Sequence, residues 1–214
     1  MEYEVKKCSV ISGAPDSDIE FIKNHIDYSS YIICADSGYL KCCELGIIPN
    51  LIIGDFDSSA YPDCDCEIIR LNPEKAYTDT FHCIMEAIER GYNRIEVYSA
   101  LGDRFDHSYS NILCLSYCKK HNVDCEIINA KNRISLITDT KKIFKEYENF
   151  SLFAYLEPCE GVTIKGAYYT AGFYGKESLD FDVDTQCGVS NYVSDDYAEI
   201  TLRKGCLLLI ESND

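Results

Sequence analysis

The sequence predicts an α/β N-terminal domain with a mostly parallel sheet, followed by an all-β C-terminal sandwich domain. In the first two thirds of the chain, short apolar runs alternate with stretches of helical periodicity. Strands that alternate with helices indicate a parallel sheet covered on both faces. From about Ile134 onward, runs of strand length rich in β-branched and aromatic residues, with frequent glycines, replace that pattern. We therefore expect one domain over residues 1–131 and a second over residues 132–214.

The N-terminal elements follow one another regularly. The expected strands are KKCSVISG, SYIICADSG, NLIIGDFDS, CEIIRL, RIEVYSAL and CEIINA. A helix over SDIEFIKNHI opens with a Ser/Asp cap, and a short helix over YLKCCELG is closed by Gly46. Two longer helices are expected from about residue 79 to 91 and from about 106 to 121.

The C-terminal part contains strand patterns and no convincing amphipathic helix. The expected strands are ISLIT, KIFKEY, SLFAYLE, GVTIKG, YAEITLRK and CLLLIES. Alternating short strands of this kind are typical of a small antiparallel sandwich.

Composition narrows the classes of function. With 20 basic against 36 acidic residues, and no cluster of basic ones, nucleic acid is not expected as a partner. No apolar run approaches the roughly 20 residues of a membrane span, and MEYEVKKCSVISG lacks the apolar core of a signal peptide. We expect a cytoplasmic protein without membrane contact. The 13 cysteines lie mostly in apolar runs and form no CxxC motif, which indicates reduced thiols and no structural zinc.

Acidic residues stand where predicted strands end. Asp36 ends YIICAD, Asp55 and Asp57 end LIIGDFD, and Asp79 begins a predicted helix. Ligands of open α/β sheets bind beyond the carboxyl ends of the strands. Each residue alone fits an ordinary role, such as a turn residue for Asp36 or an N-cap for Asp79. Together they predict a shared site for Mg²⁺, which prefers oxygen ligands and works beside phosphates.

The phosphate-binding side of such a site is less distinct, because neither a Walker A loop nor GxGxxG is present. Spacing alone also allows an exposed histidine in GDRFDH and a surface ion pair for its arginine. The candidates are Arg104 and His107, Lys75 ahead of the pair Thr78 and Asp79, and the backbone at Ser37 and Gly38.

Four stretches together resemble the thiamine pyrophosphokinase family. They are ADSGYLKCCELGIIPNLIIGDFDSS, KAYTDTF, ALGDRFDHSYSNILCL and, in the β region, GVSNYV. The first block is highly specific, whereas the last is weak by itself. The resemblance implies an enzyme that transfers a diphosphate from ATP to thiamine, giving thiamine diphosphate and AMP. It also implies a homodimer with its active site between subunits.

The resemblance assigns roles to individual residues. It implies that Asp36, Asp55, Asp57 and Asp79 hold Mg²⁺ and order the ATP phosphates. It implies nucleotide contacts at Arg104, Asp106, His107 and Asn111. It further implies that Ser190 and Asn191 line the thiamine pocket.

The chain departs from the family pattern at three places. It has Ser37-Gly38 and Gly102-Asp103 where the family usually has two glycines, and Ala76-Tyr77 where acidic or amide residues are common. Tryptophan is absent, so an aromatic wall against thiamine must come from Tyr or Phe.

In the implied reaction the thiamine hydroxyl attacks the β-phosphorus of ATP, and the catalysis is mainly positioning and charge neutralisation. Asp79 or Asp57 is the candidate proton acceptor. A strand followed by DxDxS also resembles the nucleophile loop of haloacid-dehalogenase-like phosphatases. A non-catalytic thiamine- or nucleotide-binding module is the third hypothesis.

Overall fold

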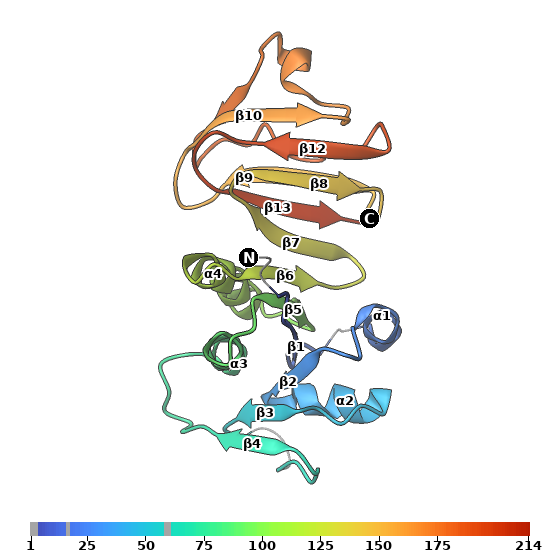
Figure 1. Cartoon of the computed structure of the whole chain (residues 1–214), viewed down its shortest axis with the longest axis vertical. Helices are drawn as coiled ribbons and strands as arrows, with labels where there is room; N and C mark the ends of the chain where they lie inside the picture. Colours follow the sequence, from blue (N-terminus) through green and yellow to red (C-terminus); the bar gives the residue numbers. More distant parts are fainter. Residues whose placement is uncertain (1–3, 16–17, 58–60) are drawn as a thin grey trace. The chain divides into compact units, whose positions relative to one another are not determined.

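The computed structural model describes residues 4–15, 18–57 and 61–214. The chain forms two compact units, Met1–Ala130 and Lys131–Asp214 (Figure 1). Each unit has its own strands and is described by itself.

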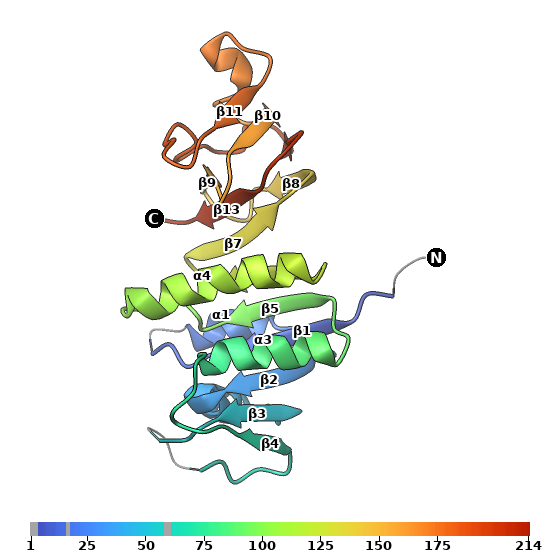
Figure 2. The ribbon, with the colours of Figure 1, turned by 90° about the vertical axis from the view of Figure 1, so that its left-hand side faces the viewer.

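The first unit is built on six parallel strands. In chain order they are β1 (Lys7–Ile11), β2 (Tyr31–Ala35), β3 (Leu51–Gly54), β4 (Glu67–Arg70), β5 (Arg94–Tyr98) and β6 (Asp124–Ile128). Their order in space is β4-β3-β2-β1-β5-β6 (Figure 1), and Figure 2 shows the run from β4 to β5 from the side. The central strands are almost continuously apolar because both of their faces are covered.

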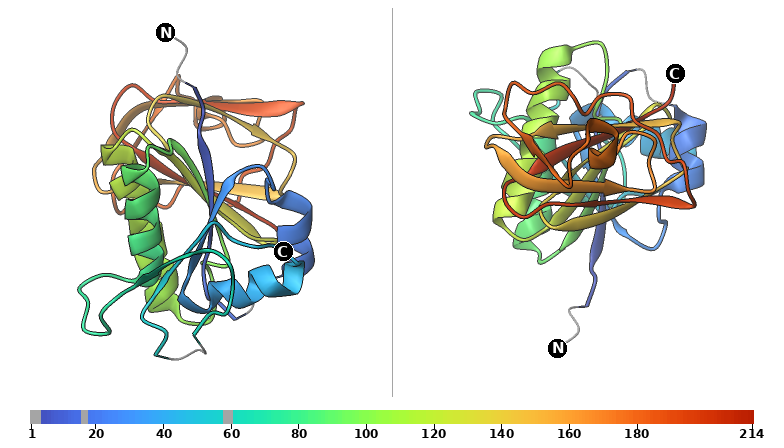
Figure 3. Two further views of the ribbon diagram at one scale, coloured as in Figure 1. Left: turned by 60° about the horizontal axis from the view of Figure 1, so that its bottom comes forward. Right: turned by 90° about the horizontal axis from the view of Figure 1, so that it is seen from above.

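Helices cover the two faces of this sheet. α1 (Ile19–His25) and α2 (Tyr39–Leu45) lie on one face, and α3 (Asp79–Glu89) and α4 (Phe105–Lys120) lie on the other (Figures 1 and 3). A short 3₁₀ turn, η1 (Asp36–Gly38), joins β2 to α2. The expected end of α2 is confirmed, because Gly46 caps it in the left-handed conformation with φ 69°.

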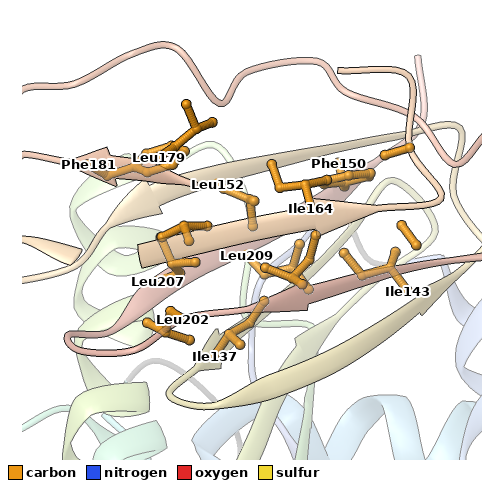
Figure 4. Close-up of a cluster of buried hydrophobic side chains, with 14 of the residues drawn as sticks. Ile137, Ile143, Phe150, Leu152, Ile164, Leu179, Phe181, Leu202, Leu207 and Leu209 are labelled. Atoms are coloured by element: carbon orange, nitrogen blue, oxygen red, sulfur yellow. The ribbon is translucent and has the colours of Figure 1, made fainter. Parts of the chain in front are cut away.

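The second unit consists of antiparallel strands. They are β7 (Asn132–Ile137), β8 (Thr140–Phe144), β9 (Asn149–Ala154), β10 (Cys159–Lys165), β11 (Leu179–Phe181), β12 (Tyr197–Thr201) and β13 (Leu207–Ser212). β13 pairs with β7 and β9, whereas β10 and β12 form the middle of the order β11-β10-β12-β8. Buried side chains from both groups of strands share one apolar core (Figure 4).

The coarse prediction, parallel strands with helices followed by antiparallel strands, is confirmed. Three details differ. Residues 36–38, expected as a strand end, form η1. A further 3₁₀ turn, η2 (Ala171–Tyr174), and the short β11 were not expected. The expectation of reduced thiols is wrong for Cys64 and Cys66, which a bend brings together as a disulfide. Within the described residues, no helix is both long and apolar enough to cross a membrane.

Candidate active site

A cavity of about 600 Å³ lies at the carboxyl ends of the parallel strands in the first unit. Its walls come from the segments after β1 and β5, from η1, and from the residues that lead into α3 and begin α4. β1 and β5 are neighbours in the sheet, although the chain visits β2, β3 and β4 between them. The cavity therefore lies at the topological switch point of the sheet, where α/β proteins bind ligands.

The backbone is strained along the same edge. Asp36, Phe56 and Ser99 follow β2, β3 and β5, and each has a positive φ, of 44°, 57° and 54°. A residue with a side chain in this region costs on the order of 1–3 kcal/mol. Such strain clusters at binding and catalytic sites, so three strained strand ends agree with the position of the cavity.

Two carboxylates and one ammonium group are in contact beside the cavity, and a third carboxylate, that of Asp36, is near enough to act on Asp79 by charge repulsion. Asp55 is buried directly after β3, and Asp79 is the first residue of α3. The Nζ atom of Lys75 forms an ion pair with an Oδ2 atom of Asp55 and lies 3.0 Å from Oδ1 of Asp79. Gly54 leaves room for Asp36, because a Cβ atom on Gly54 would stand 3.0 Å from the Asp36 carboxylate.

The pKa values of these groups follow from their contacts. The hydrogen bond from Lys75 lowers the pKa of Asp55. Burial raises the pKa of Asp79. The hydrogen bond and charge of Lys75 oppose this rise, whereas charge repulsion from Asp55 and Asp36 adds to it. Burial alone would lower the pKa of Lys75, but its hydrogen bonds to Asp55 and Asp79 outweigh this and raise it. One cation thus stabilises part of an acidic cluster.

Asp36, Asp55 and Asp79 are three of the four aspartates expected to hold Mg²⁺. Over residues 4–15, 18–57 and 61–214, no three His, Cys, Asp or Glu side chains are grouped as a ready-made metal site. The donors nevertheless fit Mg²⁺ chemically, since they are carboxylate oxygens and two of them already share a cation, the ammonium of Lys75. Asp36 and Asp79 also line the cavity.

Asp57 is placed differently from the other three aspartates. It is exposed, whereas the other three are buried or half-buried. Neither Asp57 nor Asp55 lines the cavity, and the backbone N–H of Asp57 donates to Oδ1 of Asp55 at 3.2 Å. Ser58 and Ser59, which complete the motif quoted above, lie outside the described residues.

Most of the residues predicted to contact a nucleotide line the cavity. They are Ser37, Lys75, Thr78, Arg104, His107 and Asn111. Two of these side chains are already engaged with the backbone. Thr78, not Asp79, is the N-cap of α3 and accepts a hydrogen bond from the N–H of Phe81. Asn111 is buried and donates to the carbonyl oxygen of Ala100 at 2.7 Å.

The two remaining residues of that set lie outside the cavity wall. Gly38 packs against the end of β1. Asp106 is exposed and pairs with Arg104 at 2.6 Å, so it orients a side chain that does line the cavity.

Sequence reasoning missed the hydroxyl groups at the switch point. Ser12, after β1, hydrogen-bonds to Thr80 on α3, and both side chains are buried. Ser99, after β5, is 2% exposed, lines the cavity, and has an Oγ atom with no hydrogen-bond partner among the described residues. In the sequence these residues are visible only as a serine near the end of a predicted strand. They indicate a shared site only once β1 and β5 are known to be neighbours.

A second cavity, of about 330 Å³, lies in the second unit. Tyr169, Tyr174 and Phe181 supply aromatic walls, and Ser190 and Asn191 also line it. The Ser190 side chain is exposed.

The side-chain amide of Asn191 is hydrogen-bonded to the backbone of the same unit. Its Nδ2 group donates to the carbonyl oxygen of Tyr169 at 2.7 Å, and its Oδ1 atom accepts from the N–H groups of Tyr169 and Tyr192. The predicted thiamine contact through this amide therefore competes with three internal hydrogen bonds.

The parallel sheet and its cavity define the class of protein as an α/β protein with a cavity at a topological switch point. Residues 22–127 match the family model described as the catalytic domain of thiamin pyrophosphokinase. The thiamine pyrophosphokinase of Bacillus subtilis is 24% identical to this chain, covering 98% of the chain and 100% of that protein. The chain belongs to the thiamine pyrophosphokinase family.

Solved structures agree on the fold. The crystal structure of thiamine pyrophosphokinase from Bacillus subtilis superposes with a TM-score of 0.86 at 22% identity, covering 98% of this chain and 100% of that one. The thiamin pyrophosphokinase of Geobacillus thermodenitrificans gives a TM-score of 0.83 at 21% identity, covering 97% and 98%. At these identities the likeness concerns the fold.

Proposed function

We propose that the chain transfers a diphosphate group from ATP to the hydroxyl group of thiamine, giving thiamine diphosphate and AMP. The observation that carries the proposal is the cavity at the switch point, where carboxylates and basic side chains of the family's motifs gather. Family membership supports the same reaction and does not favour a haloacid-dehalogenase-like phosphatase.

In the proposed mechanism the chain binds the phosphates of ATP and fixes the line of attack. Arg104, His107 and Lys75 contribute positive charge or hydrogen-bond donors along the cavity. Asp36, Asp55, Asp57 and Asp79 would hold Mg²⁺, which neutralises charge on the phosphate oxygens when it is bound. The thiamine hydroxyl attacks the β-phosphorus, and the bond from that phosphorus to the α-phosphate oxygen breaks, so that AMP leaves.

The hydroxyl proton passes to a carboxylate. Asp79 is the stronger of the two candidates, because it lines the cavity and its burial raises its pKa, whereas Asp57 is exposed. A raised pKa makes the Asp79 carboxylate a better proton acceptor.

We further propose that residues 1–131 are the catalytic domain, and that residues 132–214 are a β-sandwich that binds thiamine and mediates a cytoplasmic homodimer. The second cavity supports this role, because its tyrosines and phenylalanine provide the aromatic surface that a chain without tryptophan needs. In the homodimer the partner subunit's second domain completes each active site.

Product analysis tests the reaction. The protein is incubated with ATP, Mg²⁺ and thiamine, and nucleotides and thiamine esters are separated by chromatography. AMP and thiamine diphosphate are expected in equal amounts, dependent on thiamine and on Mg²⁺. Release of ADP or free phosphate without a thiamine ester would refute the proposal and favour a phosphatase.

A further inference from the structure

Lys75 occupies an unusual position for a lysine. Its side chain is only 14% exposed, and its ammonium group bridges two carboxylates from different elements, Asp55 after β3 and Asp79 at the start of α3. Those carboxylates are themselves only 9% and 23% exposed. An ion pair that is this enclosed resists solvent screening far more than a surface pair does.

The charge of the cluster is not balanced by Lys75 alone. Asp55 and Asp79 contribute two negative charges against the one positive charge of Lys75, and Asp36 acts on Asp79 by further charge repulsion. A divalent cation would neutralise the cluster better than one ammonium group does. Two cations cannot share the same oxygens without strong repulsion, so the ammonium group and a divalent cation compete for Asp55 and Asp79.

We propose that Lys75 is an internal counter-cation, which holds the metal-binding carboxylates together before the metal arrives and must leave them when it binds. The freed ammonium group stays at the wall of the cavity that Lys75 already lines, where phosphate oxygens are its next partners. Metal binding is thereby coupled to phosphate binding through one side chain. The inference rests on the proposed function only in taking these carboxylates as metal ligands.

Replacement of Lys75 by a neutral side chain of similar length distinguishes two roles. Lys75 either competes with a divalent cation for the carboxylates or forms an ion pair that only stabilises the fold. In Lys75→Met the carboxylates lose their counter-cation, so the metal-free protein should unfold at a lower temperature than the wild type. The same variant should bind Mn²⁺ about tenfold more tightly or better in the absence of nucleotide, measured by isothermal titration calorimetry. Saturating Mg²⁺ should shrink the difference in unfolding temperature, because the metal then supplies the missing charge.

Two further variants serve as controls. Lys75→Arg keeps the charge and should retain metal affinity close to that of the wild type. Lys23→Met removes a lysine from an exposed pair with Glu20 on α1 that does not line the cavity, and it should change neither metal affinity nor the response to Mg²⁺. Unchanged or weaker Mn²⁺ binding by Lys75→Met would overturn the proposal and leave Lys75 as a structural ion pair.

A second measurement covers the case in which Lys75→Met does not fold. In the wild-type protein, the side-chain NMR signal of the Lys75 ammonium group, assigned by its loss in Lys75→Arg, should shift when Mg²⁺ is added without nucleotide. A signal that stays in place at saturating Mg²⁺ would contradict displacement. Neither measurement depends on turnover, so metal competition without formation of AMP would count against the proposed reaction and not against Lys75.

Discussion

Gly38 lies directly against the backbone carbonyl oxygen of Ile11, and a Cβ atom on Gly38 would overlap that oxygen. The contact presses η1 onto the end of β1. As a result Asp36 and Ser37, which belong to the same turn, stand at the wall of the cavity. The glycine is required here by close approach, since its φ of −56° is open to any residue.

We therefore expect Gly38→Ala to lower the free energy of unfolding by about 1–3 kcal/mol, the usual cost of overpacking. Nucleotide affinity should fall as well, because η1 has to move.

Gly46→Ala is the matched control. A Cβ atom on Gly46 would have no atom within 4 Å, but the residue has a φ of 69°, so the change strains the backbone without a clash. It should cost about 1–2 kcal/mol and leave nucleotide affinity unchanged. Urea unfolding and calorimetry with ATP measure both quantities. Equal ATP affinities for the two variants would contradict this account.

Ser99 combines a strained backbone with a buried hydroxyl group that has no hydrogen-bond partner within residues 4–15, 18–57 and 61–214. Ser99→Gly removes both costs, whereas Ser99→Ala removes only the hydroxyl group. We expect Ser99→Gly to be more stable than Ser99→Ala by about 1 kcal/mol, because glycine tolerates a positive φ. Thermal unfolding of the two variants checks the difference. A glycine variant less stable than the alanine variant would show that φ at residue 99 is not strained.

Local patterns in the sequence were sufficient for most of the fold. The central strands β1, β2 and β3 are short, mainly apolar runs, and α2 ends at a glycine, so these elements follow from the residues themselves. β11 has three residues and exists through its pairing with β10, which no local pattern encodes. η2 is a single turn, too short for any helical periodicity to be visible.

The candidate site was predictable only in part, for a related reason. Asp36 and Asp79 were found because charged residues at strand ends and helix starts are conspicuous. Ser12 and Ser99 are ordinary residues whose importance depends on β1 and β5 being neighbours. The bridging position of Lys75 likewise depends on the tertiary approach of Asp55 to the start of α3.

Buried thiols should make the protein sensitive to alkaline pH. Burial raises the pKa of Cys8 and of Cys114 from 9.0 to about 12. Between these values the unfolded chain releases each thiol proton while the folded chain keeps it, so the folded state binds more protons. The free energy of unfolding must therefore fall as pH rises from about 9, by about 1.4 kcal/mol per pH unit for each such thiol.

Urea unfolding at several pH values above 9, compared with pH 8, measures this slope. Cys114→Ala should reduce it by the contribution of one thiol. Cys43→Ala, which removes an exposed thiol, serves as the control and should leave the slope as in the wild type. A Cys114→Ala slope equal to that of the wild type would refute the assignment.

Asn191 and Ser190 are adjacent and line the same cavity. Their contacts nevertheless predict different effects on stability when each is replaced by alanine. The Asn191 amide makes three hydrogen bonds to the backbone of Tyr169 and Tyr192, and the side chain is 3% exposed. Asn191→Ala leaves those backbone groups unsatisfied, so the free energy of unfolding should fall by about 2–4 kcal/mol. Ser190→Ala alters an exposed side chain and should change stability by less than about 0.5 kcal/mol.

Thiamine binding, measured by calorimetry, should separate the two roles. Under the proposed function Ser190→Ala weakens binding directly, by loss of one hydrogen bond, with unchanged unfolding. Asn191→Ala weakens binding only together with stability, because the segment that carries Tyr169 is no longer fixed against the cavity. If Asn191→Ala instead lost thiamine affinity at wild-type stability, its amide would have to contact the ligand, and the three internal hydrogen bonds would have to open when thiamine binds.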